Sequence, residues 1–347
     1  MTLCHYSDIL QQAAQLAGLS YSRTSGSSGL SSDEEASLRV SLDNELQAVW
    51  PMARWPWLVR LQERTYRADW SSATAYTAGT IVFFPQENQY YQALRSSTNE
   101  APADSAGTLN SAYWAVAVVT PSGEDYVATT AYVAGDAVYY PTTDTYYQCH
   151  TASTGNAPSN TSYWGALVPF LKYVSLTQTG ETAIGEVLDV WDLSPRRTTH
   201  ARRVSHELDE NGIECVSGPN RVWVEFKIPV PRIFGEAYSA SSTYAVGDQI
   251  QFESTSGNVP VIDFYNCVTA TSAGESPSTA AAKWERVEIP DEFKGYLGAR
   301  CASMYLTGEN DARFAVANAE ATRSWESLVD RLYRSQHQVQ RTVVGTY

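Results

Sequence analysis

Apolar residues recur at helical spacing in the N-terminal part of the chain and again near the C-terminus. They are Ile9, Ala13 and Leu16, then Leu38, Leu42, Leu46 and Val49, and finally Phe314, Ala317, Ala321, Trp325, Leu328 and Leu332. Steps of three and four residues place such side chains on one face of a helix. Ser31 followed by acidic residues at 33–35 is typical of a helix start, because acids favour the positive end of the helix dipole. The pattern predicts helices over 6–19, 31–49, about 291–306 and 314–332.

Between these helices the apolar period changes to two, which is typical of strands. Val222, Val224, Phe226 and Ile228 alternate with other residues in 221–228. A further strand is predicted over 170–176, and turn-forming residues occupy 189–199 and 209–212. This part of the chain is therefore expected to be β-rich.

A longer pattern occurs three times, with the same parts in the same order. Each copy has Tyr-x-x-Gly, then two consecutive aromatic residues, then a proline and finally a Trp. The leading Tyr and the aromatic pair lie 14 residues apart in the first two copies and 20 apart in the third. We call these copies repeat 1 (70–120), repeat 2 (126–168) and repeat 3 (238–289). Such ordered repetition indicates three copies of one structural unit.

Each repeat is predicted to be a small β-module, in which the glycine can adopt positive φ in a turn and two short strands follow. Alternation places one tyrosine of each copy in a core that the final Trp closes. These core residues are Tyr91, Tyr147 and Tyr265 with Trp114, Trp164 and Trp284. Alternation points the neighbouring pairs outward, to a binding or contact surface. The outward residues are Phe83 and Tyr90 in repeat 1, Tyr139 and Tyr146 in repeat 2, and Gln251 and Phe264 in repeat 3, where half of the aromatic pair is lost.

The repeats resemble the small chitin-binding (type 3-like) and cellulose-binding modules attached to bacterial glycoside hydrolases. The resemblance implies a few-stranded β-sandwich whose exposed aromatic residues stack on sugar rings. It makes Phe83, Tyr90, Tyr139 and Tyr146 candidate glycan contacts, and repeat 2 ranks first among the copies. Those modules usually carry an additional Trp before the central proline, where this chain has Ala or Ser in all three copies. This departure counts against glycan binding but not against the fold.

The segments outside the repeats resemble the head-to-tail adaptor (connector, or neck) proteins of tailed bacteriophages. The likeness is carried by element order and by short segments. These are Tyr6-Ser-Asp-Ile-Leu10 with the helices to 69, the run 176–188, Ser194-Pro-Arg196, Asp209-Glu-Asn-Gly-Ile213, Val222-Trp-Val224 and the helix 311–332. They cover about half of the chain. The resemblance implies a structural, non-enzymatic protein of the virion neck, synthesised in the host cytoplasm.

These observations together predict an α+β fold, in which a discontinuous helical frame with a β-hairpin region carries three small all-β modules. The predicted parts are a helical N-terminal part of the adaptor domain (1–69), repeats 1 and 2, a β-rich part of the adaptor domain (169–236), repeat 3, the C-terminal helices (290–335) and a flexible docking tail (336–347).

The adaptor resemblance also implies partners. It predicts a homo-oligomeric ring, expected to be a dodecamer, that joins the portal protein to the tail, tail-terminator or nozzle proteins. DNA would pass through the lumen without sequence-specific binding, and the net charge of −14 fits a channel that repels it. The C-terminal segment would dock on the portal. Its candidate docking residues are Gln336, His337, Gln340, Arg341 and Tyr347.

Composition and residue spacing argue against several other classes of protein. No run of residues approaches the roughly 20 apolar positions of a membrane span, and the N-terminus lacks the features of a secretory signal. The 5 cysteines and 5 histidines are scattered without the spacing of a disulfide framework or a zinc site. We therefore predict no metal and no cofactor. The acidic clusters at 189–192 and 207–210 are interpreted as solvated turns rather than a glycosidase pair, so no enzymatic activity is predicted.

Two alternatives stay open. The basic cluster of Arg196, Arg197, Arg202 and Arg203 either pairs with acidic neighbours in its own loop region or contacts DNA phosphate or an acidic neighbouring subunit. The whole chain is either the adaptor described above or a secreted polysaccharide-binding accessory protein, in which the frame is a spacer. Particle size and glycan affinity discriminate between these two functions.

Overall fold

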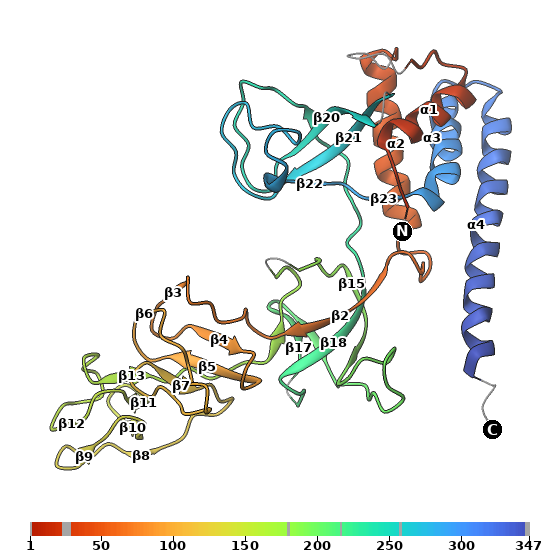
Figure 1. Ribbon diagram of the computed structural model, residues 1–347. Coiled ribbons are helices and arrows are strands. Elements are labelled where there is room, and N and C mark those ends of the chain that lie inside the picture. The colour runs from red at the N-terminus through yellow and green to blue at the C-terminus, as the bar shows by residue number, and fades with distance from the viewer. Residues whose placement is uncertain (1, 23–28, 179–180, 216, 257–258, 344–347) are drawn as a thin grey trace. The chain divides into compact units, whose positions relative to one another are not determined.

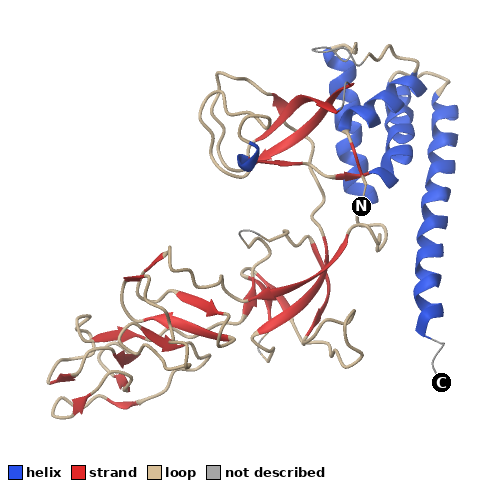
Figure 2. Ribbon diagram, viewed as in Figure 1, coloured by secondary structure: helices blue, strands red, loops and turns tan. Residues whose placement is uncertain are grey.

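The computed structural model describes residues 2–22, 29–178, 181–215, 217–256 and 259–343, with only the backbone described for 256 and 335–343. The chain is a mixed α+β protein, which confirms the predicted class. It divides into two compact units: unit 1 comprises Met1–Val59 and Pro229–Tyr347, and unit 2 comprises Arg60–Ile228. The α-helices of the described chain all belong to unit 1, and unit 2 is built from strands (Figure 2).

The helical part of unit 1 combines segments from both ends of the chain (Figure 1). Its helices are α1 (Tyr6–Ala17), α2 (Ser32–Val49), α3 (Lys294–Gly308) and α4 (Phe314–Val343). Helix α3 packs against the other three helices. It approaches α1 closely at Gly298, where a Cβ atom would come within 2.9 Å of the Gln12 side chain. Because α3 contacts α1 and α2, the two ends of the chain share one core.

Aromatic side chains and a short strand pair reinforce this union. Trp50 and Trp55 are buried and contact Phe293, with ring centroids 5.9 and 5.4 Å apart. Trp55 also meets Trp325 of α4 at 5.8 Å. Strand β1 (Leu3–Cys4) pairs with β23 (Ile289–Pro290) in antiparallel fashion. The first and last segments of unit 1 are thus joined by packing and by backbone hydrogen bonds.

The starts of α1, α2 and α4 follow the sequence signals, whereas the start of α3 and the end of α4 depart from them. Ser31 Oγ accepts a hydrogen bond from the Glu34 backbone N–H at 3.3 Å, and the Ser31 N–H donates to Glu34 Oε2 at 2.8 Å. Helix α3 begins after a 3-10 turn (Asp291–Phe293), three residues later than expected. Helix α4 continues to Val343, beyond its predicted end at 332 and into the segment predicted to be a docking tail. The added turns contain Gln and Arg, which favour helix without an apolar stripe.

Unit 2 contains two small sheets outside repeats 1 and 2, and we call these two sheets together the β-domain (Figure 1). One has the strand order β15 (Glu186–Trp191), β18 (Arg221–Lys227), β2 (Val59–Thr65), and the other β14 (Tyr173–Val174), β17 (Gly212–Glu214), β16 (Glu207–Asp209). Their shared core contains Phe170, Val190, Ile213, Val222, Val224 and Phe226. Residues 189–191 belong to β15 rather than to the predicted turn, because Val190 is buried in this core.

The three repeats share one strand arrangement, in which a hairpin is followed by a short closing strand. The strands are β4 (Ile81–Phe84), β5 (Gln89–Ala93) and β7 (Trp114–Val116) in repeat 1, β10 (Ala137–Tyr140), β11 (Thr145–Cys149) and β13 (Trp164–Ala166) in repeat 2, and β20 (Gln249–Ser256), β21 (Val259–Cys267) and β22 (Trp284–Arg286) in repeat 3. Repeats 1 and 2 add the short pairs β3 (Ala75–Tyr76) with β6 (Ser97–Thr98) and β9 (Ala131–Tyr132) with β12 (Ser153–Thr154).

Each repeat begins slightly before its predicted boundary, with a parallel contact to the hairpin. The contacts are an isolated bridge from Asp69 to Phe83, strand β8 (Glu124–Asp125) on β10, and strand β19 (Glu236–Ala237) on β20. The sequence pattern missed these starts because a two-residue strand has no measurable periodicity.

The same internal contacts hold each repeat together. The turn glycines Gly79, Gly135 and Gly247 have φ of 88°, 106° and 97°, which a residue with a side chain rarely adopts. The closing tryptophans donate from Nε1 to a backbone carbonyl at 2.9, 3.1 and 3.2 Å. Trp114, Trp164 and Trp284 are buried in the module cores, where Tyr91 is also buried and Tyr147 and Tyr265 are partly buried.

Repeats 1 and 2 contact each other within unit 2. The Gln92 side chain donates to the Ala166 carbonyl at 2.6 Å and accepts from the Val168 N–H at 2.9 Å. Gly165 lies against the Leu94 backbone, where a Cβ atom would come within 2.5 Å of the Leu94 carbonyl oxygen. This contact requires glycine at position 165.

Candidate functional site

The aromatic pair of repeat 1 does not face solvent. Phe83 and Tyr90 are each 1% exposed, so the prediction that they are available as glycan contacts is wrong. Both pack in the core of the β-domain, where the Tyr90 ring lies 4.6 Å from the Phe170 ring. Alternation identified a face of the hairpin distinct from the module core, but it contained no sign that the β-domain covers this face.

A two-residue segment of the β-domain, Asn220-Arg221, lies at the edge of this face. The Tyr90 hydroxyl donates to the Asn220 carbonyl at 2.7 Å. The Arg221 guanidinium lies over the Phe83 ring, 4.8 Å from its centroid, and Arg221 Nε donates to Asn88 Oδ1 at 3.1 Å. At the face of repeat 1, an arginine therefore stacks on an aromatic ring and donates a hydrogen bond to a side-chain oxygen of the hairpin turn.

The corresponding face of repeat 3 is also covered by the chain itself. Phe264 is 1% exposed and meets Tyr6 of α1 edge-on, with ring centroids 4.7 Å apart. Asp263 accepts a hydrogen bond from the Tyr6 N–H at 3.0 Å. Gln251 donates to Glu35 of α2 at 2.9 Å. Repeat 3 is thus docked on the helices of unit 1 through the face that repeat 1 turns to the β-domain.

Repeat 2 has the same aromatic pair in a more open setting. Tyr139 and Tyr146 are partly exposed, with ring centroids 5.1 Å apart and planes at 49°. The pair in repeat 1 has nearly the same geometry, 4.9 Å and 49°. Within the described residues, Tyr139 and Tyr146 make ring contacts only with each other. Of the predicted glycan contacts, these two alone are accessible.

Asp144 takes the place in repeat 2 that Asn88 has in repeat 1. Each stands at the hairpin turn, with Asp144 two residues before Tyr146 and Asn88 two residues before Tyr90. Their φ angles are 51° and 50°. The Tyr139 hydroxyl donates to Asp144 Oδ1 at 2.6 Å, and this hydrogen bond raises the pKa of Tyr139 because it stabilises the protonated phenol. Asp144 is exposed, so its carboxylate remains accessible beside the rings.

The basic cluster lies in the loop between β15 and β16, and it is divided between two roles. Arg197 and Arg203 stack on tryptophans of the β-domain at 5.6 and 5.4 Å, and Arg203 also pairs with Asp189 at 3.2 Å. Arg196 and Arg202 are exposed, and their side chains make no hydrogen bond or ion pair within the residues described. Two of the four arginines, Arg197 and Arg203, are therefore bound within the chain.

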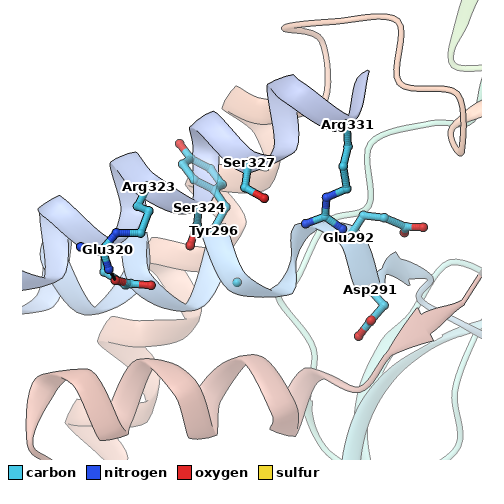
Figure 3. A pocket seen from close by; sticks show the side chains of 9 residues that line it. Asp291, Glu292, Tyr296, Glu320, Arg323, Ser324, Ser327 and Arg331 are labelled. Atoms are coloured by element: carbon cyan, nitrogen blue, oxygen red, sulfur yellow. Dashed lines mark hydrogen bonds and ion pairs between the residues drawn. The ribbon is translucent and has the colours of Figure 1, made fainter. Parts of the chain in front are cut away.

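A charged groove of about 390 Å³ lies in unit 1 along α4 and the start of α3 (Figure 3). Asp291, Glu292 and Glu320 contribute carboxylates, and Arg323 and Arg331 contribute guanidinium groups. Arg323 pairs with Glu320, and the close-up shows the Glu292 carboxylate pointing away from Arg331. Glu292 Oε2 is buried and makes no hydrogen bond to any described residue. The groove therefore combines one ion pair on α4 with charged groups that, in the described part of the chain, are not paired with one another.

The candidate portal-docking residues lie at the end of the chain. Positions 336, 337, 340 and 341 belong to the last turns of α4, and their side chains are outside the described part of the structure. Tyr347 lies outside the described residues altogether.

The described residues offer little for covalent or metal chemistry. No group of three or more His, Cys, Asp or Glu within them could hold a metal ion. The 5 cysteines are all buried. Burial raises the pKa of Cys4 to about 12 and that of Cys215 to about 11, so both thiols are protonated near neutral pH.

The residues that sequence reasoning missed are Asn88, Asp144 and the Asn220-Arg221 segment. The sequence contained a signal for Asn88 and Asp144, because repeats 1 and 2 both place an amide or carboxylate side chain two positions before Tyr90 or Tyr146. No local pattern marks Asn220 or Arg221, because their contacts with repeat 1 span more than 130 positions along the chain.

Comparison with known proteins gives no relative: no family model matches the chain, and no curated protein matches it. Among the described helices, none combines the length and apolar character needed to cross a bilayer.

Proposed function

We propose that this protein is a structural adaptor of a tailed-phage virion, assembling into a ring that joins the portal to the tail. The helical bundle of unit 1 supports the proposal most directly. Helices from the first 49 residues and from the region after 290 form one body there, which is the organisation expected for the adaptor frame. A net charge of −14 per copy would repel DNA from the wall of such a ring.

The covered aromatic faces favour this structural role over the polysaccharide-binding alternative. A glycan-binding protein displays its aromatic platforms, because sugar stacking requires open ring faces. Phe83, Tyr90 and Phe264 are each 1% exposed and stabilise contacts inside the chain. The repeats therefore serve mainly as protein-docking modules in this proposal.

The size of the purified particle tests the adaptor function. Light scattering after gel filtration should give a closed oligomer, about 460 kDa for twelve copies of a 38.2 kDa chain. Negative-stain electron microscopy should show rings with a central opening. A chain that stays monomeric at every concentration and is retained on insoluble chitin or cellulose would instead support the accessory protein.

A further inference from the structure

We infer that the open face of repeat 2, formed by Tyr139, Tyr146 and Asp144, binds the arginine loop around Arg196 and Arg202 of a neighbouring copy of this chain. The inference rests on the proposed assembly of copies into a ring. It assigns the contact to two surfaces of unit 2, and it gives the ring a heterologous interface, in which different patches of two copies meet.

The first argument is the behaviour of the same face elsewhere in the molecule. In repeat 1 it is covered by the β-domain, and in repeat 3 by α1 and α2. In both cases the partner is protein. Repeat 2 keeps the same ring geometry but leaves the pair partly exposed. A module face used for protein docking in two copies is best suited to protein docking in the third.

The second argument identifies the chemistry of the partner. Repeat 1 holds Arg221 over Phe83 and against Asn88 Oδ1. Repeat 2 replaces Phe83 by Tyr139 and Asn88 by Asp144, so the ring remains and the neutral oxygen becomes a carboxylate. A carboxylate acceptor adds ion-pair attraction to the hydrogen bond that a guanidinium group donates. The repeat 2 face therefore has the two features that hold an arginine in repeat 1, a ring and a side-chain oxygen acceptor, and its acceptor carries a negative charge.

The third argument is charge complementarity within one sequence. Residues 121–168 contain four acidic residues and neither Lys nor Arg. The loop between β15 and β16 carries four arginines between 196 and 203. All four are exposed, but Arg197 and Arg203 stack on tryptophans of their own β-domain. In the described part of the chain the side chains of Arg196 and Arg202 have no such partner and are available for a second chain.

Photocrosslinking in the full-length chain tests the contact directly. A Tyr146→p-benzoylphenylalanine variant should give a crosslinked dimer on illumination, and mass spectrometry should place the crosslink in 194–203 of the other copy. An Arg196→Glu/Arg202→Glu variant should remove this product. A crosslink to any other segment, or none in a sample that forms rings, overturns the inference and leaves the proposed function standing.

Charge reversal measures the energetic contribution. Asp144→Arg should weaken self-association by about tenfold or more, and mixing it with the Arg196→Glu/Arg202→Glu chain should restore assembly. Glu207→Arg is the matched control, since this exposed residue of β16 undergoes the same charge change outside the sequence of repeat 2. Equal assembly of Asp144→Arg and Glu207→Arg overturns the contact.

Two further outcomes separate the inference from its alternatives. A wild-type chain that never self-associates contradicts both the ring and the contact. Retention on insoluble chitin or cellulose that is lost in Tyr139→Ala/Tyr146→Ala, without any crosslink to 194–203, shows that the face binds glycan and overturns the inference.

Discussion

Tyr90 and Tyr146 are equivalent residues of two repeats, yet their hydroxyl groups contribute differently to stability because their surroundings differ. The buried Tyr90 hydroxyl accepts from the Tyr66 N–H at 2.8 Å and donates to the Asn220 carbonyl at 2.7 Å. Tyr146 is partly exposed, so water can replace any partner of its hydroxyl. Removing a hydroxyl is costly only where it leaves a buried group unsatisfied.

We therefore predict that Tyr90→Phe lowers the free energy of unfolding of unit 2 by about 1–3 kcal/mol. Tyr146→Phe, the matched control, should change it by less than about 0.5 kcal/mol. Urea unfolding followed by tryptophan fluorescence measures both variants. Equal effects at the two positions would contradict the different environments of the two rings.

At this scale the sequence predicts side-chain direction better than side-chain environment. Alternation separated the core residues Tyr91 and Trp114 from the pair Phe83 and Tyr90, and the two sets lie in different cores. It could not predict that Phe83 and Tyr90 are buried, because the residues that cover them are remote in sequence. Exposure depends on tertiary packing, which a period of two does not encode.

Among the elements, the closing strands of the repeats show how one position adapts to its neighbour. Gly165 in β13 faces the Leu94 backbone of repeat 1, and a Cβ atom there would come within 2.5 Å of a carbonyl oxygen. In repeat 3 the equivalent residue after the Trp is Glu285, which is exposed. Glycine at 165 is thus required by the contact between repeats and not by the module fold.

Gly165→Ala should separate repeat 2 from repeat 1 and destabilise unit 2 by about 1–3 kcal/mol. The linker at 119–123 should then become more sensitive to limited proteolysis. Gly308→Ala is the control, because no atom outside the adjacent backbone of its own helix lies within 4 Å of the position its Cβ would occupy. Unchanged protease sensitivity in Gly165→Ala would contradict a tight contact between the repeats.

Elements with strong periodicity were the most predictable. Helices α1 and α2 begin within one residue of their expected starts, because caps and apolar steps mark them. The ends of α4 and β15 were missed. The apolar stripe of α4 is interrupted between Leu332 and Val339, and the acidic residue at 189 resembles a turn signal. The predicted repeats needed correction only at their short parallel contacts, near 69, 124 and 236.

For the whole molecule, the decisive property is that unit 1 is discontinuous while unit 2 is one uninterrupted stretch. The chain enters unit 2 on β2 and leaves it after β18, and these two strands are neighbours in one sheet. Unit 2 can therefore fold from its own sequence. The helices before Val59 cannot, because their packing partner α3 lies beyond Pro229.

Excising 60–228 and joining the ends with a flexible linker should leave unit 1 folded, with helical circular dichroism and one cooperative thermal transition. A fragment comprising 1–228 should keep the strands of unit 2 and lose α1 and α2, because it lacks α3, which packs against both helices. Hydrogen exchange of the fragment measures this loss as rapid exchange throughout 6–49. Protection of those amides in the fragment would mean that the N-terminal helices fold without the C-terminal ones, and the shared bundle on which the adaptor proposal depends would have to be abandoned.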